Sequence, residues 1–453
     1  MTKSMTTGTP AKLIILFAFP LIIGNIFQQF YNMADTFIVG RTLGVNALAA
    51  LGCTGSIIFF ILGFVMGFSS GLSIITSQRF GANDMEGVKR SFATSLILSL
   101  MLSVVFTIGA CIFTRPFLKL LQTPPELIDD AYSYLIIIFG GIIASVLYNF
   151  LSNMMRALGD SKMPLYFLIF TCILNIILDY MCILIFDMGV AGAGAATIFS
   201  QVIAAILCAV YIKKKMPAFW VERRHFRITL NEIKCHIKTA LPMAFQMSII
   251  AIGTLILQSA INGLGPNAVA ANTSAQKIDN IACMPLNSLG AAMATYAAQN
   301  FGAGKIDRIR KGVFQCVLMT IGTSIFMAIL NFCFGGTLAS FFIGADAPEV
   351  VAYAQTFLSI NGSLYWVLGL LFVYRFTLQG LGNGTVPTVA GIMELIMRSI
   401  VGIFLVDLMG YTGACLSNPL AWTGACIPLC IAYYREVRKL EKNRLANATY
   451  LNS

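Results

Sequence analysis

The chain has 453 residues, of which 58% are hydrophobic and only 11% charged, and its formal net charge is +11. Soluble domains are about 45–50% apolar and about 25% charged, so this composition excludes a soluble globular domain and predicts an integral membrane protein. The basic surplus is expected to orient the chain and to contact anionic lipid headgroups, and it predicts no nucleic-acid partner.

Apolar stretches long enough to cross a bilayer, which takes about 20 residues, recur along the whole chain. They predict an all-α protein of twelve transmembrane helices separated by short polar segments. The predicted ranges are 13–38, 48–76, 92–114, 131–155, 163–186, 193–212, 239–262, 268–298, 313–335, 351–378, 387–408 and 412–434. The first stretch follows Lys3 and Lys12, but it is too long for the apolar region of a signal peptide and is therefore taken as the first span.

Basic residues are concentrated in alternate loops. The even-numbered loops carry most of them, among them Arg156 and the run around 305–311, and residues 213–238 between helices six and seven carry eight. The odd-numbered loops hold little more than Arg41, Arg115 and Lys119. The positive-inside rule therefore predicts a multi-pass protein of the plasma membrane with both termini in the cytoplasm.

The residues needed for enzymatic chemistry are scarce. The twelve cysteines are scattered singly, and the two histidines, His225 and His236, lie in the basic segment between helices six and seven. Residues 302–305 (GAGK) resemble the end of a phosphate-binding loop, but the earlier Gly and the following Ser or Thr are missing. We expect neither an enzyme nor a cofactor, other than a transported ion.

The two halves of the sequence correspond to each other. Residues 44–50 (GVNALAA) match 265–271 (GPNAVAA), and 78–82 (QRFGA) match 299–303 (QNFGA) at the same offset. Further matches join 158–160 (LGD) to 381–383 (LGN), Pro164 to Pro387, and Pro20 to Pro242. These matches predict two pseudo-symmetric six-helix bundles in a parallel repeat, which suits alternating access to a central cavity. The predicted parts are an N-lobe (1–212), a cytoplasmic connector (213–238), a C-lobe (239–434) and a basic cytoplasmic tail (435–453).

These paired motifs, in this order and spacing, resemble the multidrug and toxic compound extrusion (MATE) family, within the wider multidrug/oligosaccharidyl-lipid/polysaccharide flippase superfamily. The resemblance covers nearly the whole chain. It implies a monomeric efflux antiporter that exports cationic and amphiphilic small molecules, driven by inward H⁺ or Na⁺ flow, through a rocker-switch cycle between two lobes.

Four polar residues of the first half form a candidate cation site. Asp35 lies toward the outer end of helix one, Asn175 and Asp179 share one face of helix five, and Thr197 lies early in helix six. Placing a charge inside a bilayer costs free energy, so such residues usually have a function. Their oxygen atoms can bind Na⁺ or H⁺. In MATE transporters the N-lobe cation site is similar, and it maps onto these four residues. The alternative is structural, with Asp35 at a helix end and the Asn–Asp pair in a packing contact.

The second half lacks this set, because Arg398 and Gly402 stand where Asn175 and Asp179 would fall. The acidic residues that some MATE members carry in helices seven and ten are also missing, so the resemblance places coupling in the N-lobe. Charged residues are nevertheless present in the C-lobe spans. We expect a neutralised network between helices eight and eleven, with a second coupling or substrate site as the alternative. Its residues are Lys277, Asp279, Glu394 and Arg398, while Arg375 is expected to reach the membrane interface.

Antiport requires only that a drug and an ion compete for the same buried negative charge. Tyr31 and Phe27 are candidate drug contacts, although an aromatic stripe on a helix also serves plain packing. The main rival is a flippase for lipid-linked oligosaccharides or lipid II, whose cavity needs basic residues to meet a diphosphate. Dye efflux measured beside precursor flipping separates the two.

Overall fold

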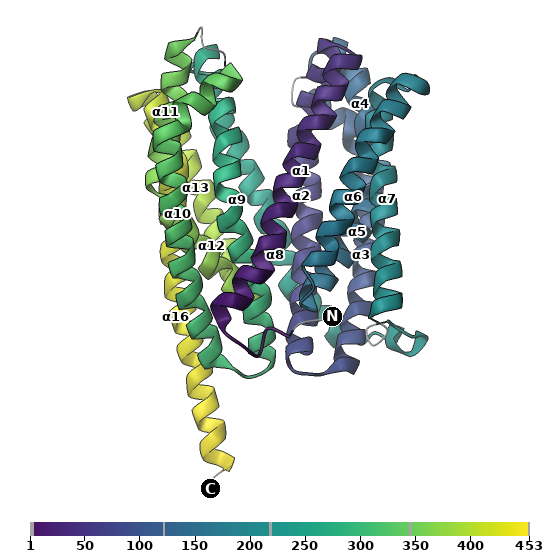
Figure 1. Cartoon of the computed structure of the whole chain (residues 1–453), viewed down its shortest axis with the longest axis vertical. Coiled ribbons are helices and arrows are strands. Elements are labelled where there is room, and N and C mark those ends of the chain that lie inside the picture. The colour runs from purple at the N-terminus through teal and green to yellow at the C-terminus, as the bar shows by residue number, and fades with distance from the viewer. Residues whose placement is uncertain (1–3, 121–122, 217–219, 344–346, 452–453) are drawn as a thin grey trace. The chain divides into compact units, whose positions relative to one another are not determined.

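The computed structural model describes residues 4–120, 123–216, 220–343 and 347–451, and within these ranges it contains helices and turns but no strand (Figure 1). Contacts between backbone segments divide the chain into two units. The first unit contains residues 20–248 and the second contains residues 4–19 and 249–453. The prediction of an all-α architecture built from two bundles is therefore confirmed.

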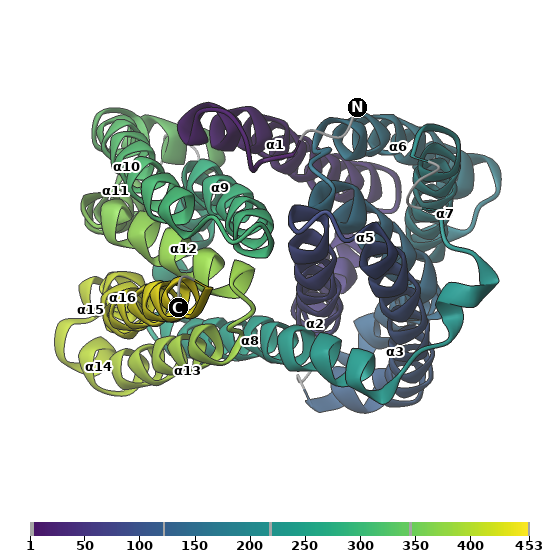
Figure 2. The ribbon, with the colours of Figure 1, turned by 90° about the horizontal axis from the view of Figure 1, so that it is seen from below.

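The first unit contains the helices between α1 (Pro10–Thr42) and α8 (Leu230–Asn262), together with parts of these two helices. In it α2 packs against α3 and α5, and α7 packs against α4, α5 and α6. Figure 2 shows α2, α3, α5 and α7 grouped in this way. The elements are α2 (Val45–Gly81), α3 (Met85–Leu120), η1 (Pro125–Leu127), α4 (Ile128–Gly140), α5 (Ile142–Ala157), α6 (Lys162–Tyr180), η2 (Met181–Ile185), α7 (Gly189–Lys215) and η4 (Arg223–Phe226).

The second unit repeats this plan. In it α9 packs against α10, α11 and α12, and α16 packs against α12 and α13. The elements are α9 (Pro266–Gly302), α10 (Ile306–Ile343), α11 (Pro348–Ser363), α12 (Tyr365–Gly380), α13 (Thr385–Ile400), η5 (Val401–Leu405), α14 (Val406–Met409), α15 (Tyr411–Cys415) and α16 (Ser417–Leu451). Both η2 and η5 are single π-helical turns, and each follows the helix that starts after an LGD or LGN motif.

The twelve predicted spans are present. Nine helices of the described chain are long and apolar enough to cross a membrane, and the pairs α4–α5 and α11–α12 form two more spans that bend by 48° and 51°. The remaining predicted range, 268–298, lies within α9, which has 37 residues and a less apolar sequence rich in Ala and Asn. The helices run beyond the predicted ranges because their polar ends continue past the apolar segments from which the prediction was made.

Backbone conformation repeats along with the sequence. Gly44 and Gly265 precede α2 and α9 with φ of 89° and 96°, and Gly159 and Gly382 precede α6 and α13 with φ of 87° and 84°. A side chain is strained in this left-handed region, so glycine is required at the same turns of both halves. The residue that follows Gly159 or Gly382 caps the next helix with its side chain. Asp160 Oδ1 accepts from the Met163 amide at 3.2 Å, and Asn383 Oδ1 accepts from the Val386 amide at 3.3 Å.

Two long helices are each divided between the units. In α1 (Pro10–Thr42) the division falls at Pro20, and in α8 (Leu230–Asn262) it falls after Ser248. The predicted lobe boundaries follow chain order instead, so residues 4–19 and 239–248 pack outside the lobes to which the sequence assigned them. The boundary prediction cannot detect this exchange, because hydropathy marks where a helix lies and not what it packs against.

The repeated motif at the ends of α2 and α9 helps to fix these exchanged segments. In the second unit, Gln299 Oε1 accepts from the Met5 amide at 2.8 Å, and the Asn300 amide donates to the Met5 carbonyl at 3.1 Å. In the first unit, Arg79 pairs with Glu232 at 2.7 Å, at the start of α8. The predicted connector is therefore partly helical, because α7 ends at Lys215 and α8 begins at Leu230.

Close helix packing adds to this anchoring in the first unit. Gly67 and Gly71 lie one turn apart on α2 and meet the backbone of α8 at Ala244 and Ala240. A Cβ on Gly71 would lie 2.4 Å from the Ala240 Cα, so only glycine permits this approach. Small residues four apart let membrane helices come together in this way.

Candidate functional site

Asp35 lies on α1 with its carboxylate almost sealed from solvent. The residue is 9% exposed, and its Oδ1 has no hydrogen-bond partner in the described part of the chain. Tyr31 lies one turn earlier on the same helix, and its hydroxyl lies 3.0 Å from the Thr197 hydroxyl on α7. This contact places the C-terminal half of α1 against the N-terminal part of α7 within the first unit.

Asn175, Asp179 and Thr197 form a connected group between α6 and α7. With the Asn175 amide oriented to satisfy its neighbours, its nitrogen donates to Asp179 Oδ2 at 3.0 Å and its oxygen accepts from the Thr197 backbone amide at 3.1 Å. Both Asn175 and Asp179 are fully buried. The second oxygen of Asp179, Oδ1, has no hydrogen-bond partner among the described residues.

The two carboxylates act on each other electrostatically. The negative charge of Asp35 repels a negative charge on Asp179, and neither carboxylate has a basic partner in the described chain. Two uncompensated negative charges in an apolar interior are costly, and a proton or a metal cation bound between them removes most of that cost. The structure thus brings all four predicted residues into one cluster, with Tyr31 as a fifth member.

Tyr134 is a further member that the sequence did not reveal. It lies on α4, is buried, and feels the charges of both Asp35 and Asp179. Gly194 of α7 makes room for its ring, since a Cβ there would lie 3.3 Å from Tyr134 Cδ2. A lone tyrosine in an apolar helix carries no sequence signal, so only the packing of α4 on α7 identifies it.

Phe27, the other predicted drug contact, lies on α1 and is 37% exposed. Its role as a drug contact stays a prediction. Tyr31 is held by its hydrogen bond to Thr197, which gives it a fixed position beside the carboxylates.

The charged residues of the second unit form two separate clusters instead of one network. In the first, the Tyr365 hydroxyl donates to Asp279 Oδ1 at 2.6 Å, and Asn331 donates to Tyr365 at 2.8 Å. Lys277 is not part of it and instead lies 5.7 Å from the centre of the Phe342 ring. Residues two apart on a helix point to different sides, which is why Lys277 and Asp279 do not pair.

The second cluster joins Glu394 to two arginines. Glu394 pairs with Arg375 of α12 and lies 3.7 Å from Arg398 on its own helix. All three are nearly fully buried, so the expected snorkelling of Arg375 to the interface does not occur. The expected neutralisation of charge is incomplete in this cluster, because Arg375 and Arg398 share the single carboxylate of Glu394.

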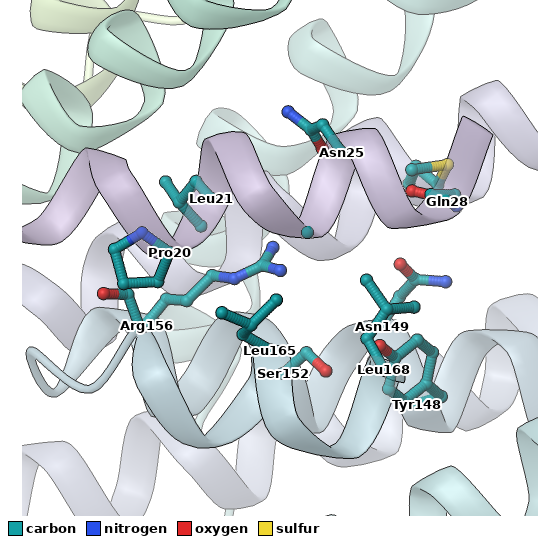
Figure 3. Close-up of a pocket in the computed structure, with 13 residues that line it drawn as sticks. Pro20, Leu21, Asn25, Gln28, Tyr148, Asn149, Ser152, Arg156, Leu165 and Leu168 are labelled. Carbon is teal, nitrogen blue, oxygen red and sulfur yellow. The ribbon is translucent and has the colours of Figure 1, made fainter. Parts of the chain in front are cut away.

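A cavity of about 100 Å³, lined by both polar and apolar side chains, lies in the first unit between α1, α2, α5 and α6 (Figure 3). Arg156, which the sequence placed in a loop as an orientation residue, belongs to the last turn of α5 and lines this cavity. Asn25, Gln28 and Asn149 also line it. No carboxylate is among its lining residues in the described chain.

Comparison with known proteins assigns the family. The MatE family profile matches residues 20–181 and again residues 242–404, one match in each half. The chain belongs to the MatE family. MatE membership agrees with the repeated fold, and it confirms the resemblance found in the sequence. The family is one of transporters and not of enzymes.

Relatives and solved structures of MatE type cover most of the chain. The probable multidrug resistance protein YpnP of Bacillus subtilis is 30% identical over 397 residues, which is 87% of this chain and 86% of YpnP. The probable multidrug resistance protein YoeA of the same organism is 28% identical over 404 residues, with the same coverage. A crystal structure of a MATE in complex with MaL6 matches with a TM-score of 0.91 at 23% identity, covering 98% of this chain and 100% of that one. This structural match shows the fold.

Proposed function

We propose that this chain is an efflux antiporter of the plasma membrane that exports organic cations and other amphiphilic compounds in exchange for H⁺ or Na⁺. The observation that carries the proposal is the pair of buried carboxylates, Asp35 and Asp179, each with one oxygen that no described protein group satisfies. The names of YpnP and YoeA, both probable multidrug resistance proteins, support the export of drugs.

Competition for negative charge provides the coupling. When an ion or proton binds at Asp35 and Asp179, the site loses its attraction for a cationic drug, which is then released. When the ion leaves, the exposed charge favours drug binding again. The ligand set of two carboxylates, an amide and a hydroxyl accepts Na⁺ or H⁺. Antiport follows, since drug and ion do not bind together.

Alternating access is supported by the division of α1 and α8 between the two units. Pro20 stands where α1 divides, and a proline inside a helix removes one backbone hydrogen bond and favours bending there. We propose that the two units alternate between an inward-open and an outward-open arrangement in a rocker-switch cycle.

The basic residues of the even-numbered loops support a topology with both termini in the cytoplasm. A C-terminal green fluorescent protein fusion is then expected to be fluorescent in cells.

The test is transport of a cationic dye in proteoliposomes, with pH and Na⁺ gradients imposed separately. Asp35→Asn keeps the shape of the side chain and removes its charge, so gradient-driven dye export is expected to fall at least about tenfold. Asp130→Asn is the matched control, because Asp130 is an exposed acid of the first unit and its change should leave export unaltered. Export by Asp35→Asn at the wild-type rate under both gradients would refute the coupling assignment.

A further inference from the structure

The interior of the second unit holds more positive than negative charge. Arg375 of α12 and Arg398 of α13 flank the single carboxylate of Glu394, and each of the three residues is at most 5% exposed. Arg375 donates a hydrogen bond to this carboxylate, whereas Arg398 Nη2 lies 3.7 Å from it, which is too far for a hydrogen bond. Among the described residues, no other carboxylate forms an ion pair with either arginine. The cluster therefore carries one uncompensated positive charge.

Arg398 has hydrogen-bond donors left to hold another group. Its Nε and Nη1 are both buried, and neither has a hydrogen-bond partner in the described part of the chain. The Nε of Arg375 is buried and unpartnered in the same way. By contrast, Arg79 closes on Glu232 at 2.7 Å in the first unit. A guanidinium withdrawn from water with unsatisfied donors is costly, so Arg398 favours an anion from outside the protein.

The internal repeat places Arg398 at the counterpart of the candidate cation site. Arg398 matches Asn175, and Gly253 of α8 matches Tyr31, since each lies eleven residues after the proline shared by α8 and α1. Gly253 lies directly against the arginine, because a Cβ there would be 3.3 Å from Arg398 Cδ and 3.5 Å from its Nη1. A glycine in place of the tyrosine thus makes room for the long side chain. The same place in the repeat holds oxygen ligands in the first unit and a guanidinium in the second.

We propose that Arg398 binds a small inorganic monoanion, with chloride as the physiological occupant, inside the second unit. One negative charge balances the cluster, and side chains that are nearly sealed from solvent admit a bare ion more readily than an organic acid. Chloride is spherical and accepts hydrogen bonds from any direction, so it can use donors on different sides of a guanidinium. The inference goes beyond the proposed antiport and does not depend on it, because the anion is bound in the other unit and need not be transported.

The melting temperature of the purified full-length protein provides the first test. Chloride replaces gluconate at constant Na⁺ concentration and ionic strength, and scanning fluorimetry follows the apparent melting temperature. Gluconate is too large for a sealed site and serves as the reference anion. An ion that binds only the folded state raises the melting temperature with its concentration, so the wild type should gain at least about 2 °C by about 150 mM chloride. Bromide, a sphere of similar size, should act in the same way.

Three variants assign the response to Arg398. Arg398→Gln removes the surplus charge and leaves Arg375 paired with Glu394, so the variant should fold and its melting temperature should not respond to chloride. Arg398→Lys keeps the charge but has fewer donors, so it should need more chloride for half of its response. Lys311→Gln is the matched control, because Lys311 is an exposed basic residue of the second unit, and it should respond as the wild type does. A response of wild-type size in Arg398→Gln, or no response in the wild type, would overturn the proposal.

Chlorine NMR measures binding directly and does not depend on a change in stability. Exchange of chloride with a protein site broadens the resonance of free chloride, and added bromide should reverse this broadening in the wild type by competition. Arg398→Gln should lose the bromide-sensitive part, and Lys311→Gln should keep it. Bromide-sensitive broadening that persists unchanged in Arg398→Gln would place the anion elsewhere and overturn the assignment. Failure of the efflux function would instead appear as absent gradient-driven dye export, which leaves both chloride measurements unaffected.

Discussion

The close contact between α2 and α8 predicts a strong effect of adding a single methyl group. In Gly71→Ala the new Cβ would lie 2.4 Å from the Ala240 Cα and 3.1 Å from the Ala240 nitrogen. Carbon atoms pack best at about 3.5–4.0 Å, so the two backbones must separate by more than about 1 Å. Overpacking of this kind costs about 1–3 kcal/mol. Because both groups are backbone atoms of helices, no side-chain rotation can relieve the clash.

The measurement is the apparent melting temperature of the detergent-solubilised protein, followed by scanning fluorimetry. Gly71→Ala should lower it by at least about 2 °C. Gly55→Ala is the matched control, because Gly55 lies on the same helix and its Cβ would meet no atom within 4 Å. Alanine favours a helix over glycine, so this control should melt at or slightly above the wild-type temperature. Equal melting temperatures for the two variants would refute the packing argument.

Three further substitutions test other contacts through the same melting measurement or through proteolysis. Asp160→Ala removes the cap of α6 and should cost about 1 kcal/mol, whereas Asp160→Asn should cost less because Asn383 caps α13 in the same position of the second half. Gln299→Leu leaves the Met5 amide without its acceptor, so limited proteolysis should cut the N-terminal segment faster than in wild type, and an unchanged cleavage rate would contradict this anchoring. Glu394→Gln leaves two buried arginines without their carboxylate and should destabilise by about 3–5 kcal/mol; wild-type melting would show that the cluster is not held by charge.

Much of the site follows from local sequence rules. The membrane class, the twelve spans and the internal repeat depend on hydropathy and on matching motifs, which need no knowledge of packing. The four residues Asp35, Asn175, Asp179 and Thr197 stand out because buried polar residues are rare in such helices. Their convergence within the first unit agrees with that prediction.

Other features depend on which helices meet, and the sequence does not encode this locally. Tyr134 joins the carboxylates only because α4 packs on α7, where Gly194 makes room for its ring. Proximity in sequence predicts that Lys277 and Asp279 interact, yet they point to different sides of α9, and Asp279 accepts a hydrogen bond from Tyr365, which is 86 residues away. Arg156 shows the same limit, since a basic residue near a helix end is equally consistent with an orientation signal.

The sequence by itself determined that the chain crosses the membrane twelve times, in two matched halves, with rare acids in the first half. Hydrophobic length and residue type are properties of each segment, and they are therefore legible without a fold. Only the tertiary structure decided that α1 and α8 are divided between the units, that the C-lobe charges form two clusters, and that Arg156 faces a cavity. These features arise from contacts between distant segments, where the position of a side chain depends on its neighbours in space.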